Sequence, residues 1–142
     1  MTATLTRAHV CTSHRRALLA NYTGQQQEAL ITLLSVAKRH LGSSGGRTAA
    51  LVLLGLYNGP RFPLDLTELR TLDAGNLAAA ITVIQMDAAR THAEVHDILN
   101  ALLGVNWVGS QLELWAYQLR LPKRCKKEAL PSLQAHVDGI PS

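Results

Sequence analysis

The sequence predicts an all-α protein, a single compact domain of five to six helices in an orthogonal or bundle-like arrangement. The chain has 142 residues, of which 47% are hydrophobic, and this is enough to enclose one core. Leu and Ala dominate the apolar residues, and both favour helix. Apolar residues also recur with the helical period in several segments that begin or end at capping residues.

Residues 1–23 are weakly patterned, so we expect a weakly ordered N-terminal segment with at most a short helix over 13–20. The first clear helix is predicted over 25–41. Its core-facing stripe consists of Leu30, Leu33, Leu34, Ala37 and Leu41. The glycines and serines of residues 42–46 then predict a flexible connector.

A second helix is predicted over 47–57, apolar nearly all round and therefore central in the domain. Asn58-Gly59-Pro60 ends it, because proline cannot continue a helix. Asp65 is expected to cap a short helix that extends to about residue 72, with Glu68 reaching back as in a capping box.

Asp73 is expected to cap a helix over 74–89 that buries a stripe of four residues, Leu77, Ile81, Ile84 and Ala88. The sequence Thr91-His-Ala-Glu94 predicts a capping box that opens a helix through Leu103, closed by Gly104. The buried stripe of that helix is expected to be Val95, Ile98, Leu99 and Leu102.

Ser110 is expected to cap a last helix over 111–121, with Leu112, Trp115, Ala116 and Leu119 inward. Residues 24–121 would then form the helical domain, and 122–142 a basic C-terminal tail. Six residues are predicted to be buried together in the core: Leu53, Leu54, Ile81, Ile84, Leu99 and Leu102.

Charge is distributed unevenly along the chain. Residues 1–61 carry a net +6, residues 62–119 carry −5 and residues 120–142 carry +3. Segments of opposite sign suit oriented docking to a charged partner, although folding can also mix them on one surface.

The composition predicts a cytoplasmic protein that does not bind membranes. No apolar run reaches the roughly 18 residues of a membrane span, and no signal-peptide pattern opens the chain. Cys11 and Cys125 stand near opposite ends and do not form a disulfide framework, so reduced thiols are expected.

No catalytic motif is recognisable, so we predict neither an enzyme nor a bound cofactor. The one conceivable metal site combines Cys11, His14, His92 and His96. His92 and His96 have the spacing of helical zinc ligands, but Ala93 stands where a zinc protease has its Glu. We therefore predict no metal.

Three sequence motifs are specific when they occur in combination: Leu-Tyr-Asn-Gly at 56–59, Arg-Phe-Pro-Leu-Asp-Leu-Thr-Glu-Leu at 61–69, and Met-Asp-Ala-Ala-Arg at 86–90. Over residues 47–100 the chain resembles a family of small uncharacterised proteins carried by plasmids, phages and integrative elements of proteobacteria. The resemblance implies a context rather than an activity. Small accessory proteins of mobile elements often bind host machinery, as anti-CRISPR proteins do.

These observations predict a non-enzymatic protein-binding module of a mobile genetic element, with an anti-CRISPR inhibitor of a Cas subunit or surveillance complex as its leading form. Asp87, Glu94 and Asp97 are expected to face solvent and to compete for a basic nucleic-acid-binding surface, with Phe62 as an apolar anchor. The alternative is a nucleic-acid-associated accessory or regulatory protein. Its phosphate contacts would come from the tail residues Arg120, Lys123, Arg124, Lys126 and Lys127.

Overall fold

The computed structural model describes residues 7–89 and 93–119, and these form only helices, turns and loops. The all-α prediction is therefore confirmed. The elements in chain order are α1 (Arg7–Leu19), α2 (Gly24–His40), α3 (Ser44–Tyr57), the 3₁₀ helix η2 (Leu66–Thr71), α4 (Ala74–Ala89), α5 (Val95–Leu103) and α6 (Val108–Gln118). No helix in this part of the chain is long and apolar enough to cross a bilayer.

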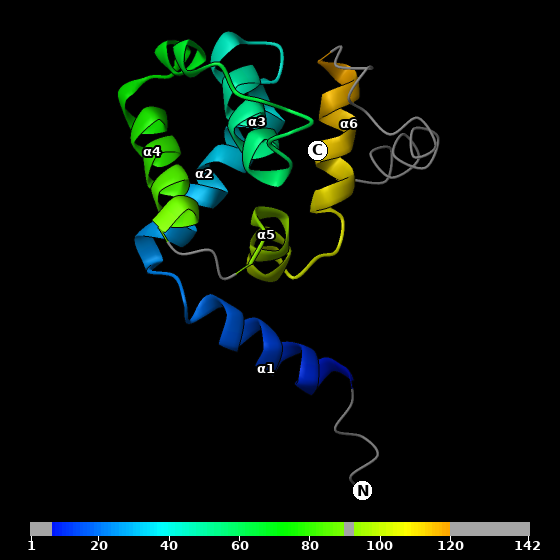
Figure 1. Cartoon of the computed structure of the whole chain (residues 1–142). Coiled ribbons are helices and arrows are strands. Elements are labelled where there is room, and N and C mark those ends of the chain that lie inside the picture. Colours follow the sequence, from blue (N-terminus) through cyan, green and yellow to red (C-terminus); the bar gives the residue numbers. More distant parts are fainter. Residues whose placement is uncertain (1–6, 90–92, 120–142) are drawn as a thin grey trace, which may run out of the picture.

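The helices pack around α2 and α3 (Figure 1). α2 contacts both α3 and α4, while α6 stands beside α3 on the opposite side from α4. The short α5 contacts α2, α3 and α6, and α1 packs mainly against α5. α5 therefore connects α1 to the main body of the fold.

α1 begins at Arg7, earlier than the short helix expected over 13–20. α2 agrees closely with its prediction and begins with a capping box. The amide of Gln26 donates to Thr23 Oγ1 (3.1 Å), and the amide of Thr23 donates to Gln26 Oε1 (3.0 Å). Four of the five predicted stripe residues, Leu30, Leu33, Leu34 and Ala37, are buried together with Ala29, whereas Leu41 is the C-cap residue and only partly buried.

The flexible connector predicted for 42–46 is wrong in its second half. α3 already begins at Ser44, and Ser43 Oγ caps it by accepting from the Gly46 amide (3.1 Å). A Cβ at Gly46 would overlap the His40 carbonyl, so glycine is needed here for close approach of the chain to the end of α2.

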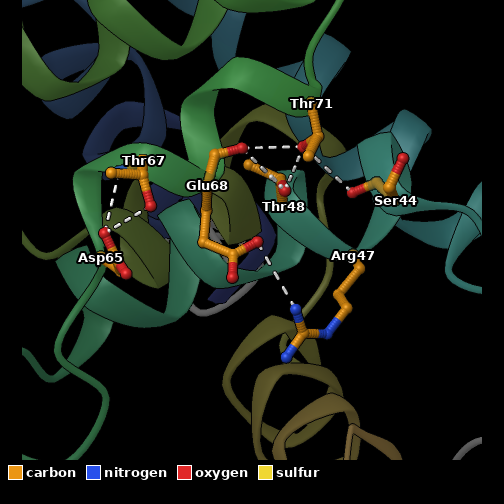
Figure 2. Close-up of polar contacts among 7 residues, drawn as sticks. All are labelled: Ser44, Arg47, Thr48, Asp65, Thr67, Glu68 and Thr71. Carbon is orange, nitrogen blue, oxygen red and sulfur yellow. Dashed lines mark hydrogen bonds and ion pairs between the residues drawn. The ribbon is translucent and has the colours of Figure 1, made fainter.

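Asp65 caps η2, as predicted: its Oδ1 accepts from the amide of Thr67 (2.9 Å) and from the Thr67 hydroxyl (2.8 Å). Glu68 does not complete a capping box. Its carboxylate instead faces the Arg47 guanidinium of α3 (3.5 Å), as Figure 2 shows. The carboxylate therefore ties η2 to α3 rather than to its own N-terminus.

Two threonines fasten the same junction. Thr71 Oγ1 donates to the Glu68 carbonyl (2.7 Å) and lies 2.6 Å from Thr48 Oγ1 (Figure 2). Thr48 is fully buried in α3, so this hydroxyl pair satisfies a polar group inside the fold.

The predicted α4 exists and is capped by Asp73, whose Oδ1 accepts from the Asn76 amide (2.8 Å). The predicted face is correct only in part: Leu77 and Ile84 are partly buried against the core, but Ile81 and Ala88 are exposed. The buried residues are Ala79, Ala80, Val83 and Met86, whereas Ile81 is 48% exposed. The small side chains of Ala79 and Ala80 let α4 approach α2 closely, and this turns the larger Ile81 outward.

α5 begins at Val95, so the predicted capping box is not its start. Glu94 occupies the N-cap position without a side-chain cap hydrogen bond, and Thr91 and His92 lie outside the described residues. Gly104 ends the helix with φ of 67°, as its predicted C-terminal role requires.

α6 also begins earlier than predicted, at Val108, which places Ser110 inside the helix. The Val108 amide donates to Asn100 Oδ1 of α5 (3.0 Å), so a tertiary contact satisfies this end of the helix. Of the predicted core residues, Leu53, Leu54 and Leu99 are fully buried, Ile84 and Leu102 are partly buried, and Ile81 is exposed.

Candidate functional site

A groove lies between α2 and the connection from α5 to α6. Its volume is about 680 Å³. Eight residues line it: Ile31, Leu34, Ser35, Lys38, Arg39, Leu103, Val105 and Trp107. We call it the α2–α5 groove. Ile31 is 40% exposed and Leu103 38% exposed, so two large aliphatic side chains remain in contact with water.

A second hollow, of about 700 Å³, lies between α1 and α5 and shares Val105 with the groove. Arg15 is held in its wall, since Arg15 Nε donates to the Ala101 carbonyl (2.8 Å). The Arg15 guanidinium also lies against Gly104, within 3.4 Å of where a Cβ would stand. A positive charge is thus fixed beside the end of α5.

The lining of both hollows is basic or neutral. Lys38 and Arg39 line the α2–α5 groove, and Arg15 and His14 line the hollow beside it. Among the described residues, no Asp or Glu lines either hollow. These hollows therefore combine apolar surface with positive charge.

A buried polar cluster joins α3, the loop after it and α6. Arg61 forms a bidentate ion pair with Glu113 (2.6 and 2.7 Å), whose side chain is only 6% exposed. The Tyr57 hydroxyl donates to Glu113 Oε1 (2.9 Å). Burial, followed by this hydrogen bond, raises the pKa of Tyr57 to about 12. The cluster is well satisfied, and it fastens the loop to α6.

Sequence reasoning missed Glu113. The residue stands between Leu112 and Leu114 and is buried like them. Its partner Arg61 is 52 positions away, so no local spacing indicates the pair. The one available signal is a single carboxylate within an otherwise apolar helical segment.

His96 packs against this cluster. Its ring meets the Tyr57 ring edge-on, with centroids 5.1 Å apart, and its Nε2 lies 3.5 Å from Asp97 Oδ1. His14 is exposed on α1. The side chain of Cys11 and residue His92 lie outside the described part of the structure. Within that part, no group of three or more His, Cys, Asp or Glu could hold a metal ion.

The predicted acidic residues gather where α4 ends and α5 begins, and we call Asp87, Glu94 and Asp97 the acidic cluster. Glu94 and Asp97 are exposed, whereas Asp87 is half-buried. Burial, followed by the nearby Glu94, raises the pKa of the Asp87 carboxyl. The expectation of full solvent exposure is thus correct for two of the three carboxylates.

The predicted anchor Phe62 is a core residue with 2% exposure, and the Arg61 guanidinium lies 4.6 Å from its ring centroid. The Arg61–Glu113 pair holds the loop that buries it, so Phe62 does not reach the surface. The five basic tail residues Arg120, Lys123, Arg124, Lys126 and Lys127 lie outside the described residues.

The fold and the groove define a small all-α protein with an apolar, basic hollow on its surface. The chain belongs to a family of unknown function (DUF7673), whose family model matches residues 27–107. Every residue that lines the α2–α5 groove lies within this match, while Glu113 lies beyond it. No curated protein and no solved structure matches the chain.

Proposed function

We propose that the protein is a non-enzymatic protein-binding module of a mobile genetic element and that its partner is a host protein. The preferred host partner is a Cas subunit or surveillance complex. The observation that carries the proposal is the exposure of large hydrophobic side chains on so small a fold. Ile31, Leu66, Ile81, Leu103 and Tyr117 are between 38% and 71% exposed. Two of them, Ile31 and Leu103, line the α2–α5 groove, and exposed apolar side chains at a hollow are typical of protein-binding surfaces.

The charge of the surface supports the same proposal. Glu94 and Asp97 are exposed near the half-buried Asp87, and such carboxylates suit a surface that otherwise binds guide RNA. Charges of this kind mainly set the rate and orientation of encounter, whereas buried apolar contacts supply affinity. The mobile-element context is supported by the sequence motifs at 56–59, 61–69 and 86–90.

The test is an interference assay. A bacterium with an active CRISPR system is transformed with a targeted plasmid, with and without expression of the chain. We expect transformation efficiency to rise when the chain is present, and the purified chain to co-elute with the reconstituted surveillance complex. Unchanged interference together with no co-elution would refute the Cas partner.

A second candidate, a nucleic-acid-associated accessory protein, is favoured by one observation: the cations Arg15 and Arg39 line two adjoining hollows. Binding through phosphates falls steeply with salt, by about a thousandfold or more between 50 and 200 mM for six or more contacts. Measuring the affinity for single- and double-stranded oligonucleotides across that range separates the two candidates. Tight, salt-sensitive binding would favour the second.

A further inference from the structure

We propose that the hollow between α1 and α5, which we call the α1–α5 hollow, binds a small aliphatic carboxylate, an anion of one charge carried on an apolar chain. The proposal goes beyond the proposed function and does not depend on it, because a small-molecule site can exist with or without a protein partner.

The hollow has the size and the surface of a small-molecule site. It lies where α1 packs against the end of α5 (Figure 1), and its volume of about 700 Å³ is within the usual range, roughly 300–1,000 Å³. Leu18 and Val105 are half-buried in its lining and Ala101 is buried, so a bound aliphatic chain would meet aliphatic surface. The described part of the lining contains no Phe, Tyr or Trp on which an aromatic ligand could stack.

Arg15 presents a fixed cation to the hollow. Its Nε donates to the Ala101 carbonyl in the last turn of α5 (2.8 Å), and its guanidinium lies over Gly104. A Cβ at Gly104 would stand 3.4 Å from Nη2 and 3.5 Å from Nη1 and Cζ, so the missing side chain lets the planar group approach.

These contacts leave the end of the guanidinium available. The Ala101 carbonyl takes the Nε proton, whereas Nη1 and Nη2 of Arg15 have no hydrogen-bond partner among the described residues. Nη1 and Nη2 together form a fork that binds both oxygens of a carboxylate side by side. Because α5 holds the guanidinium in place, little side-chain freedom remains to be lost when a ligand binds.

Asn100 supplies further donors beside Arg15. Its Oδ1 accepts from the Val108 amide (3.0 Å), so the opposite side of its amide group carries Nδ2 away from that contact. Nδ2 has no hydrogen-bond partner within the described part of the chain, and Asn100 lines the hollow. The start of α6 therefore orients a second donor group at the same end of α5.

The surrounding charge favours an anion. Glu28 is the first acidic residue of the sequence, and residues 1–27 contain three Arg. Residues 98–106, which include the α5 side of the hollow, contain no charged residue. The carboxylate of α5 itself, Asp97, lies in the first turn of the helix, and its ion-pair contact is with His96 (3.5 Å).

The same geometry favours a ligand with a single negative charge. The C-terminal end of a helix carries roughly half a negative charge, and Arg15 lies at that end of α5. One guanidinium beside this partial charge complements a carboxylate better than a phosphate, which carries about one and a half to two negative charges.

Three probes of equal chain length test this chemistry: octanoate, octanamide and octyl phosphate. Calorimetric titration of the full chain should show that octanoate binds about tenfold or more tightly than octanamide, which has the same chain without the charge. Equal affinities, or no binding of octanoate, would overturn the proposal. Tighter binding of octyl phosphate than of octanoate would assign the hollow to phosphates and would also overturn it.

A peptide C-terminus carries the same carboxylate chemistry, so the tripeptide acetyl-Ala-Ala-Leu with a free carboxylate is titrated beside the other probes. We expect it to bind more weakly than octanoate. Tighter binding of the tripeptide would assign the hollow to the C-terminus of a protein and would refute a small-molecule ligand.

Two-dimensional NMR locates the bound probe. Octanoate should shift the backbone amide resonances of Ala101 and Gly104, while that of Ile81 on α4 should stay in place. Shifts centred on Ile31 would place the aliphatic chain in the α2–α5 groove and would contradict the proposal. The wild-type titrations and this map need no variant, so they test the proposal even if a substitution unfolds the protein.

Substitutions of two neighbouring arginines test the fork. Arg15→Gln should weaken octanoate binding about tenfold, to the level of octanamide, and should leave octanamide binding unchanged. Arg16→Gln is the matched control, because Arg16 is exposed on the same helix and lies outside the described lining, so its octanoate affinity should equal that of the wild type. Equal losses in the two variants would show a general effect of charge and would refute the site.

Arg15→Lys separates the fork from the charge. Lysine keeps the cation but cannot bind Ala101 and two carboxylate oxygens in one plane, so octanoate affinity should lie between those of the wild type and Arg15→Gln. Wild-type affinity in Arg15→Lys would contradict recognition by the fork. Circular dichroism checks that each variant retains its helices.

Discussion

The two ends of α5 differ sharply, although the helix has only nine residues. At its start, Glu94 and Asp97 are exposed beside Asp87, and Phe62, the apolar anchor predicted to accompany these carboxylates, is buried. At its end, Leu103 is exposed in a groove that also contains Lys38 and Arg39. The first end has charge without an apolar anchor, while the second has an anchor and the opposite charge. Charge alone steers encounters, so the second end is the better candidate for holding a partner.

The comparison also shows why charge patterns in a sequence are ambiguous. Carboxylates in the first turn of a helix and cations in the last turn are favourable for the helix itself. Asp97 lies in the first turn of α5, and Lys38 and Arg39 lie in the last turn of α2. Only the surrounding surface distinguishes a stabilising charge from a binding one.

The largest effect is expected from a substitution that removes core packing beneath α5. Leu99→Ala should lower the free energy of unfolding by about 2–5 kcal/mol, through lost burial and the cavity left behind, because Leu99 is fully buried. Urea denaturation followed by circular dichroism measures the loss. Ile81→Ala is the control: its side chain is 48% exposed and the loss should stay below about 1 kcal/mol. Equal losses in the two variants would contradict the buried face assigned to each helix.

The substitution Glu113→Gln should perturb the start of α5 but not its end. The change removes the carboxylate charge that pairs with the Arg61 guanidinium and should cost about 3 kcal/mol, toward the lower limit for a broken buried pair because Arg61 is 21% exposed. Tyr57 bonds to Glu113 and contacts the ring of His96, so the His96 resonances in NMR spectra should shift. The Leu103 methyl resonances should not.

Tyr57→Phe is the milder companion of this variant. It removes one hydrogen bond to Glu113 but keeps the ring against His96, so the cost should be about 1 kcal/mol. For the Glu113→Gln variant, a shift of the Leu103 resonances as large as that of the His96 resonances would show that the two ends of α5 are not independent.

Neutralising the acidic end should have a small effect on stability. Glu94→Gln and Asp97→Asn should each cost about 0.3–1 kcal/mol at low ionic strength, because each removes negative charge near the positive end of the α5 dipole. The loss should shrink in 1 M salt, which screens exposed charges. An equal loss at low and at high salt would contradict the electrostatic origin of the effect.

The smallest effect concerns the pH dependence of stability. Burial, followed by Glu94, raises the pKa of Asp87 above its ordinary 3.8, so the folded protein holds this proton more tightly than the unfolded chain. Stability therefore falls as the pH rises from 3.8 through the folded pKa. Asp87→Asn should melt at a higher temperature than the wild type at neutral pH, with the difference disappearing in acid. If Asp87→Asn is less stable than the wild type at neutral pH, the result would contradict a destabilising charge at Asp87.

Local signals predicted most of the fold. The capping role of Asp73, the stripe of α2 and the helix-ending Gly104 depend on residues a few positions apart, and all three are observed. The face of α4 was not predictable in this way. That helix is apolar nearly all round, so its periodicity does not distinguish Ile81 from Val83, and close packing against α2 decides.

Helix starts and the candidate site depend on contacts between distant residues. The Val108 amide at the start of α6 is satisfied by Asn100, and the Glu113 carboxylate by Arg61. The groove likewise needs Ile31 and Leu103, which no local pattern connects. The sequence therefore predicts the charged residues of the surface but not the hollow that some of them line.

The corner between α2 and α3 bears on how the chain folds. α2 ends at His40 and α3 begins at Ser44, and Gly46 lets the two helices meet across this turn without steric conflict. Closing so short a loop costs little entropy, and contacts between neighbouring segments form fastest. We infer that the α2–α3 pair is an early folding unit on which α4, α5 and α6 then assemble. A larger residue at position 46 would overlap the His40 carbonyl, so it would destabilise this corner and with it the folding unit on which the other helices assemble.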